Sequence, residues 1–169
     1  IKNLSGFGCR ILASDIRENP SLKGLCTYVD NETLYKACDI LSLHMPLLES
    51  TRHFVNAETI ARMKDGVTII NCARGELMHI PDMIRGIETQ KIGALALDVF
   101  DKEDGIYHEN RRDDILSNRD MAYLRQFPNV IMTQHMAFYT DAAVQSMVFC
   151  GVEGLCDFAK TGHTETELV

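Results

Sequence analysis

Three polar side chains that can do chemistry follow apolar runs of strand length in this sequence. Arg74 comes shortly after the run at 67–71, Glu103 lies just beyond the run at 92–99, and His135 follows the run at 129–133. Open α/β sheets place their ligand crevice beyond the carboxyl ends of the strands. We therefore expect these three side chains to face one edge of a sheet.

These three residue types fit one kind of reaction. An arginine can hold a carboxylate in a two-pronged hydrogen-bonded fork and keeps its charge. A carboxylate beside an imidazole fixes the tautomer of the ring and favours its protonated form, which suits acid–base catalysis near neutral pH. The set suits a substrate with a carboxylate next to a carbonyl or hydroxyl group, with a nicotinamide exchanging hydride.

Each of these residues also has an explanation without catalysis. Arg74 could form a surface ion pair, Glu103 could be a solvated loop carboxylate, and His135 could be a packed, hydrogen-bonded histidine. Spacing alone does not prove that the three converge. The other histidines show no comparable arrangement and are expected to be structural or exposed: His44, His53, His79, His108 and His163.

The elements that must position these side chains alternate between strands and helices. Runs predicted as strands cover 10–15, 39–43, 67–71, 92–99 and 129–133, and predicted helices cover 31–37, 57–63, 82–90, 118–125 and 140–160. The strand runs are nearly continuous in hydrophobicity, which is typical of a parallel sheet covered on both faces. The sequence therefore predicts an α/β fold with a doubly wound, Rossmann-like parallel sheet.

The start of the chain fits the middle of a dinucleotide-binding domain. Asp15 ends a predicted strand, as does the acid that binds the adenosine ribose about 20 residues after a glycine-rich loop. Gly6 and Gly8 are better explained as a helix C-cap than as that loop. We expect residues 1–8 to be the last turns of a helix. Asp15 favours NAD because it repels a 2′-phosphate; Arg17 leaves NADP open, and Asp15 could also simply form a turn.

Composition limits the class of protein. Seventeen basic and 24 acidic residues give a net charge of −7, with no basic stripe for a nucleic acid. No apolar run approaches the roughly 18 residues of a membrane span, so no membrane partner is expected. Six cysteines without a C-x-x-C pair indicate reduced, mostly buried thiols in a cytoplasmic protein.

Three motifs occur in the order of a known family: NCARG at 71–75, DVFxxE at 98–103 and HxAFYT at 135–140. Together with their surroundings they resemble the D-2-hydroxyacid dehydrogenase family, in its D-lactate dehydrogenase and VanH-like branch. The resemblance implies a Rossmann-like NAD-binding domain. It also implies a homodimer formed through that domain, with the excursion at 101–125 contributing to the contact.

The resemblance also implies roles for the three polar residues. Arg74 would bind the substrate carboxylate, Glu103 would support the histidine, and His135 would be the general acid during reduction and the base in reverse. Phe138 would wall the substrate pocket, which favours a small or apolar 2-oxo acid. The cofactor would be NAD, contacted by Asp15, Ile16, Met45, Pro46, Thr51, Cys72, Ala73, Arg74 and Asp98.

The resemblance divides the chain into two parts. Residues 1–139 would be an NAD-binding domain lacking its first strand and glycine loop, and 140–169 a helix and tail returning to a substrate domain that is largely absent. His79 and the two residues after it depart from the family pattern, so the next helix should start differently. The alternative function is a non-catalytic NAD-binding scaffold, like the corepressors of this family.

Overall fold

The structure is a computed structural model that describes residues 1–107, 110 and 118–165. It forms two compact units, Ile1–Gln134 and His135–Val169. Among these described residues, the first unit carries the strands and the second carries one long helix.

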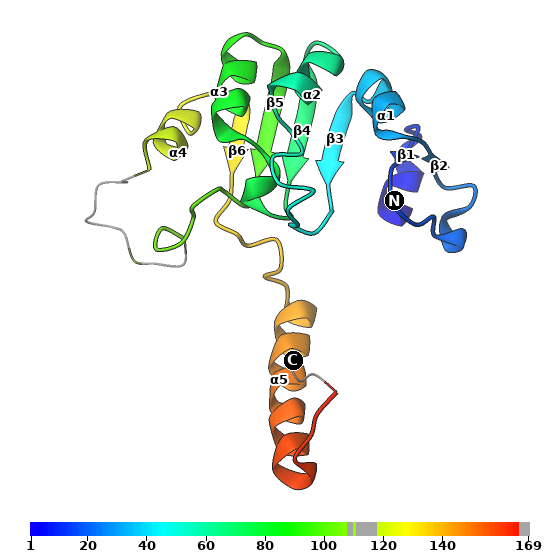
Figure 1. The fold of residues 1–169 in the computed structure, drawn as a ribbon, viewed down its shortest axis with the longest axis vertical. Helices are drawn as coiled ribbons and strands as arrows, with labels where there is room; N and C mark the ends of the chain where they lie inside the picture. Colours follow the sequence, from blue (N-terminus) through cyan, green and yellow to red (C-terminus); the bar gives the residue numbers. More distant parts are fainter. Residues whose placement is uncertain (108–109, 111–117, 166–169) are drawn as a thin grey trace. The chain divides into compact units, whose positions relative to one another are not determined.

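A four-stranded parallel sheet is the centre of the first unit (Figure 1). Its strands lie in the order β3 (Ile40–Leu43), β4 (Val67–Asn71), β5 (Ile92–Leu97) and β6 (Val130–Met132). All pairs are parallel, so the four carboxyl ends share one edge of the sheet. The four predicted strands are confirmed, β4 at the predicted bounds and the other three with different end residues, and so is the doubly wound α/β class.

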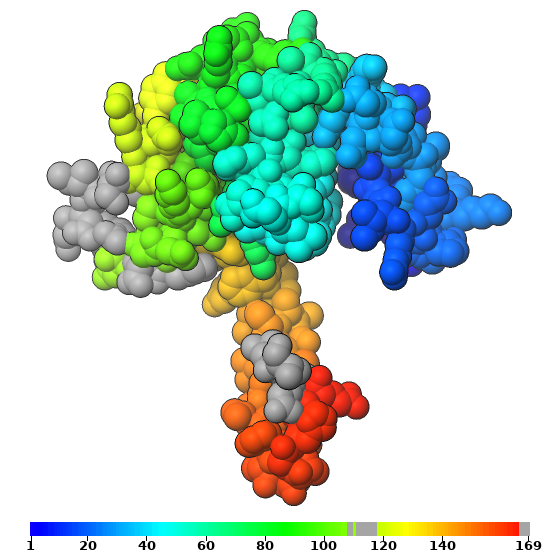
Figure 2. Space-filling model, viewed as in Figure 1, coloured from blue at the N-terminus to red at the C-terminus, as the bar shows by residue number. Residues whose placement is uncertain are grey.

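Helices α2 (Ala57–Arg62) and α3 (Ile80–Glu88) lie over one face of this sheet, and Figure 2 shows their atoms hiding it. They are flanked by α1 (Asn31–Ala37) and α4 (Arg119–Leu124). Polar side chains start three of these helices by accepting hydrogen bonds from backbone N–H groups in the first turn: Asp30, Asn56 and Asn118. Local sequence thus fixes where the predicted helices begin.

Helix α3 is the exception to the predicted boundaries. It was expected at 82–90, after Pro81, but it begins at Ile80 and places Pro81 inside its first turn. His79 occupies the N-cap position without a capping hydrogen bond from its side chain, and its Nδ1 lies 2.8 Å from Asp82 Oδ2. Residues 79–81 thus form the start of this helix, and their effect relative to the family pattern stays a prediction.

The core lies between the sheet and α2 and α3. Burial alternates along the strands: Leu41 and Leu43 in β3 and Val67 and Ile69 in β4 are buried. On the edge strands, side chains of the opposite face are exposed, with Ile40 at 62% and Ile131 at 66%. At these edge strands the opposite face of the sheet is therefore open within the first unit.

A second, two-stranded parallel sheet pairs β1 (Leu12–Ala13) with β2 (Thr27–Tyr28). The strand predicted at 10–15 is shorter than expected, and β2 was not predicted. The 3₁₀ helices η1 (Lys2–Phe7) and η2 (Pro20–Leu22) lie near it in sequence, and a third, η3 (Gly75–Leu77), follows β4. Gly8 ends η1 in a left-handed conformation, φ +70°, which confirms the predicted C-cap.

The second unit contains α5 (Asp141–Thr161), capped by Thr140 and ended by Gly162 with φ +73°. Apolar side chains of α5 are exposed within this unit, including Met147, Val148 and Leu155. One expectation for this segment needs correction, namely that no apolar run approaches the length of a membrane span. By length and composition alone, α5 is also apolar enough to cross a membrane, because its few charges leave a long apolar window. Globular proteins contain such helices too.

The cysteines also differ from expectation in one respect. All six are free thiols, as predicted. Four of them are exposed and Cys26 and Cys38 are half-buried, so the prediction of mostly buried thiols is wrong. The exposed thiols lie outside the strands: Cys9 follows η1, Cys72 lies on the turn after β4, and Cys150 and Cys156 lie on α5.

Burial of Tyr35 gives a testable pH effect. Its ring lies in the core 6.0 Å from that of Phe54, and loss of hydration raises the pKa of Tyr35 to about 12, with Arg62 opposing the shift. Between about pH 10 and about pH 12 the unfolded chain loses this proton and the folded chain keeps it, so the free energy of unfolding should fall as pH rises. Urea unfolding should show a shallower fall in Tyr35→Phe; an unchanged slope would refute this.

Candidate active site

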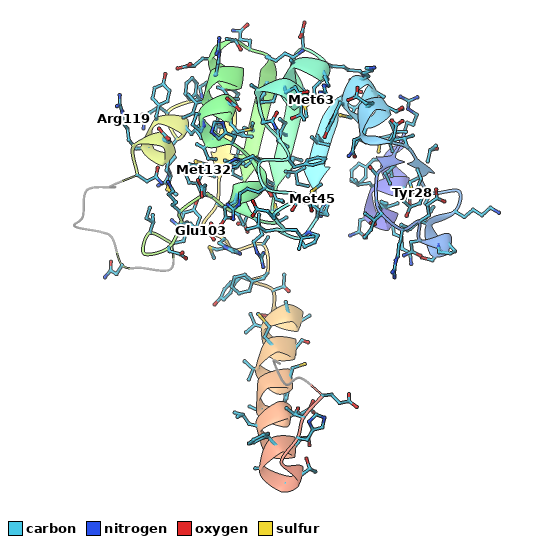
Figure 3. The ribbon with its side chains drawn as sticks, in the orientation of Figure 1. Tyr28, Met45, Met63, Glu103, Arg119 and Met132 are labelled. Atoms are coloured by element: carbon cyan, nitrogen blue, oxygen red, sulfur yellow. The ribbon has the colours of Figure 1, made fainter. Side chains whose placement is uncertain are left out.

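The carboxyl ends of β3 and β4 border a hollow of about 550 Å³. Residues 44–47, which follow β3, and residues 72–74, which follow β4, line it. The structure thus brings together five of the predicted cofactor residues: Met45, Pro46, Cys72, Ala73 and Arg74. Figure 3 shows Met45 at this end of the sheet and Met63 toward the opposite end.

Arg74 stands on the turn between β4 and η3, with an exposed side chain. Its Nη1 donates a hydrogen bond to the backbone oxygen of Ala73 at 2.7 Å. Within residues 1–107, 110 and 118–165, no ion pair involves Arg74. The guanidinium therefore has donors available at the hollow, and the surface ion pair considered from the sequence is not formed here.

Asn71 shapes the turn that carries Arg74, although it is not among the predicted site residues. This last residue of β4 is fully buried. Its side chain accepts a hydrogen bond from Ala73 N at 3.0 Å and donates one to Arg74 O at 2.8 Å. The sequence does contain a sign of this role, because Asn71 is an amide at the end of a mostly apolar strand. A buried amide there needs hydrogen-bond partners.

Asp98 and Glu103 follow β5 at the same edge of the sheet. Asp98 is buried, and the Thr133 hydroxyl after β6 donates a hydrogen bond to its Oδ1. Glu103 is half-buried, and its Oε2 accepts a hydrogen bond from Phe100 N at 2.7 Å. Figure 3 shows Glu103 at the same end of the sheet as Met45. Glu103 is thus held by its own loop and is not a freely solvated carboxylate.

Thr51 and His44 belong to the segment after β3. The Thr51 hydroxyl accepts from Leu48 N and donates to Pro46 O, both at 2.8 Å, so it stabilises this loop. His44 was expected to be structural or exposed. It is exposed, but it also lines the hollow, and its Nε2 is hydrogen-bonded to Ser42 Oγ at 2.8 Å.

The remaining predicted residues lie in two other places. Asp15 follows β1 and is exposed; its Oδ1 accepts a hydrogen bond from Arg17 N at 3.1 Å, and the adjacent Ile16 is 98% exposed. His135 and Phe138 belong to the second unit, where their rings meet edge to face with centroids 6.4 Å apart. Convergence of His135 with Arg74 and Glu103 stays a prediction.

A parallel α/β sheet with a hollow at its carboxyl edge is the arrangement in which Rossmann-like domains bind their ligands. The family model described as D-isomer specific 2-hydroxyacid dehydrogenase, NAD binding domain, matches residues 1–137. The chain therefore belongs to the D-isomer specific 2-hydroxyacid dehydrogenases, and the resemblance inferred from its motifs is confirmed.

Individual relatives agree with this assignment. An aromatic 2-oxoacid reductase of Clostridium sporogenes is 39% identical, and the match covers 100% of this chain and 51% of the relative. A D-lactate dehydrogenase from Sporolactobacillus superposes with a TM-score of 0.93 at 33% identity, covering 99% of this chain and 50% of that one. The NAD complex of a Lactobacillus delbrueckii enzyme gives 0.90 at 31% identity, covering 99% and 51%. The chain spans about half the length of these relatives.

The residues of the first unit fit NAD, the cofactor of this family's domain. The hollow lies at the sheet edge where open α/β sheets bind ligands. The exposed carboxylate of Asp15 follows a strand, where a ribose hydroxyl would find an acceptor. Residues 44–47 and 72–74 line this hollow and would hold part of the cofactor.

Cys72 offers a chemical probe of the hollow. Partial desolvation, with the nearby Asp98 carboxylate as a second cause, raises the pKa of the Cys72 thiol. Because the thiolate is the nucleophile, alkylation of Cys72 by iodoacetamide should reach its half-maximal rate at a higher pH than a free cysteine peptide. Peptide mass spectrometry would resolve Cys72 from the other thiols. A midpoint at or below that of the peptide would contradict the assigned environment.

Proposed function

We propose that this chain is the NAD-binding half of an enzyme that interconverts a 2-oxo acid and a D-2-hydroxy acid. The observation that carries the proposal is Arg74, a guanidinium without an ion-pair partner among the described residues, at the rim of the hollow expected to hold part of the cofactor. The family and the named relatives, which include D-lactate dehydrogenases and an aromatic 2-oxoacid reductase, support it.

Each residue has one task in this proposal. NADH, when bound, supplies the hydride that reduces the carbonyl carbon. Arg74 binds the substrate carboxylate through two hydrogen bonds and so orients the carbonyl group. His135 gives its proton to the carbonyl oxygen as that oxygen gains charge, and takes it back in the oxidation direction. Glu103 orients the imidazole, and Phe138 walls the apolar side of the substrate.

We further propose that residues 1–139 form an NAD-binding domain completed by a preceding strand and glycine loop, and that 140–169 return to a substrate domain. The half-length match to the relatives supports this. So do the open sheet face at Ile40 and Ile131 and the apolar surface of α5. The Sporolactobacillus match covers 99% of this chain and therefore includes α5. In this proposal α5 packs on protein and not on lipid.

Homodimerisation through the NAD-binding domain and a cytoplasmic location are also proposed. Six free thiols fit a reducing compartment. The part of the excursion at 108–109 and 111–117, expected to contribute to the dimer, lies outside the described residues. Light scattering of the full-length protein should give the mass of two chains, and a monomer would contradict the dimer.

The full-length protein should oxidise NADH in the presence of small or apolar 2-oxo acids. A panel of pyruvate, phenylpyruvate and 2-oxoisocaproate, each with NADH and with NADPH, tests this. We expect NADH-dependent turnover, slower turnover with NADPH because of Asp15, and a D-configured product. No turnover with any of them would contradict the proposal. The scaffold alternative is not favoured, because the matched relatives are named reductases and dehydrogenases.

A further inference from the structure

The turn that carries Arg74 is fixed from inside by Asn71. The carboxamide spans the turn, accepting from Ala73 N and donating to Arg74 O. The backbone oxygen of Asn71 in addition accepts a hydrogen bond from Asp98 N at 2.9 Å. The side chain of this one buried residue therefore holds the Arg74 turn together, and its backbone oxygen joins the turn to the end of the neighbouring strand β5.

Gly75 brings the same turn against the loop that follows β5. A Cβ built on Gly75 would lie 2.1 Å from Phe100 C, 2.3 Å from Phe100 O and 2.4 Å from Asp101 N. Those atoms are backbone and cannot rotate away as a side chain would. The site therefore requires glycine for lack of space, and the Arg74 turn rests directly on the peptide between Phe100 and Asp101.

This peptide leads to Glu103. Phe100 N, on the other side of the same residue, donates a hydrogen bond to Glu103 Oε2 at 2.7 Å. A path of backbone contact and one hydrogen bond thus joins the Arg74 turn to the Glu103 carboxylate. The Arg74 turn follows β4 and the Glu103 loop follows β5, so the contact between them depends on the pairing of these two strands.

We propose that Asn71 and Gly75 are positioning residues that hold Arg74 in a fixed place relative to the Glu103 loop. The proposal rests on the proposed function, because it assumes that Arg74 binds the substrate carboxylate. Neither residue touches substrate in this account; both act through Arg74. A substitution at either position should displace the Arg74 turn and weaken the binding of a carboxylate. The same substitution should have little effect once Arg74 has been replaced.

A double-mutant cycle in the full-length protein tests this. Asn71→Asp keeps the acceptor for Ala73 N and removes the donor to Arg74 O. Asn71→Asp and Gly75→Ala should each lower kcat/KM for pyruvate about tenfold to hundredfold. In an Arg74→Ala background each should change it less than about twofold. Gly75→Ala adds no charge, so it separates lost positioning from repulsion of the substrate by a new carboxylate.

Gly93→Ala is the matched control. A Cβ on Gly93 would also meet backbone, 2.5 Å from Gly66 O, but at the opposite end of β5. It should lower the melting temperature, and its effect on kcat/KM should be the same with and without Arg74. Effects of Asn71→Asp and Gly75→Ala that simply add to that of Arg74→Ala would overturn the proposal.

Binding of oxamate, an unreactive mimic of pyruvate, separates failure of this proposal from failure of the proposed function. Its dissociation constant from the NADH complex, measured by fluorescence, needs no turnover. A wild-type protein that binds oxamate without reducing any 2-oxo acid counts against the function only. Oxamate affinity that is unchanged in both Asn71→Asp and Gly75→Ala counts against the positioning role, whatever the turnover.

Discussion

Replacing His135 with alanine in the full-length protein should lower kcat for 2-oxo acid reduction by a factor of about 10²–10⁴, the usual contribution of a general acid. Hydride addition leaves negative charge on the carbonyl oxygen, and without the imidazole only water can supply the proton. His135 does not serve NADH binding in this account, so the dissociation constant of NADH should stay nearly unchanged. Stopped-flow and steady-state kinetics measure the two quantities separately.

The backbone at His135 agrees with a functional role. Its φ is +53°, a left-handed conformation that costs energy for a residue with a Cβ and occurs at functional sites. His53, Gln90 and Lys102 share this feature, so it is not a marker by itself. His163→Ala, a change in the same unit beyond α5, is the matched control and should keep full turnover. Equal kcat in His135→Ala and wild type would end the assignment of the general acid.

Replacing Arg74 with alanine should produce the second large loss. A charge-assisted, two-pronged contact to a desolvated carboxylate is worth about 2–5 kcal/mol, so kcat/KM for pyruvate should fall by a factor between about 30 and about 5,000. Arg74→Lys keeps the charge but not the fork and should fall between alanine and wild type. Steady-state kinetics over a wide range of pyruvate concentration would show the largest loss of reaction rate at low pyruvate concentration.

Arg85→Ala is the control for the loss of a positive charge. Arg85 lies exposed on α3, away from residues 72–74, and its removal should leave kcat/KM within about twofold of wild type, as is usual for surface substitutions. If Arg74→Ala behaves like Arg85→Ala, the carboxylate is bound elsewhere.

The sequence predicted the central sheet well because its signals are local. The strand at 67–71 and the helix at 31–37 match β4 and α1 residue for residue, the first as a bounded apolar run and the second through its Asp30 cap. By contrast β2 is a two-residue strand, too short to show any period. The exposure of Ile40 and Ile131 was not predicted, because hydrophobicity alone does not tell which apolar side chains lie on an edge strand.

The part of the candidate site that directly follows the strands was predictable from the sequence. The rule that ligands bind at the carboxyl edge predicted the place of Arg74. The family resemblance implied Met45, Pro46, Cys72 and Ala73, and these residues line the same hollow as Arg74. The contact of Gly75 with the peptide after Phe100 could not be read from the sequence. It depends on the register between β4 and β5, which only the folded sheet fixes. Asn71 was readable in principle, as a polar end to an apolar strand.

A crystal structure of the full-length protein with NADH and oxamate tests the central claim most directly. We expect the Arg74 guanidinium within about 3 Å of both carboxylate oxygens, and an imidazole nitrogen of His135 within about 3 Å of the 2-oxo oxygen. Glu103 should lie against the far side of that ring. Oxamate bound away from the turn at 72–74, with Arg74 in solvent and His135 remote from the ligand, would contradict the account.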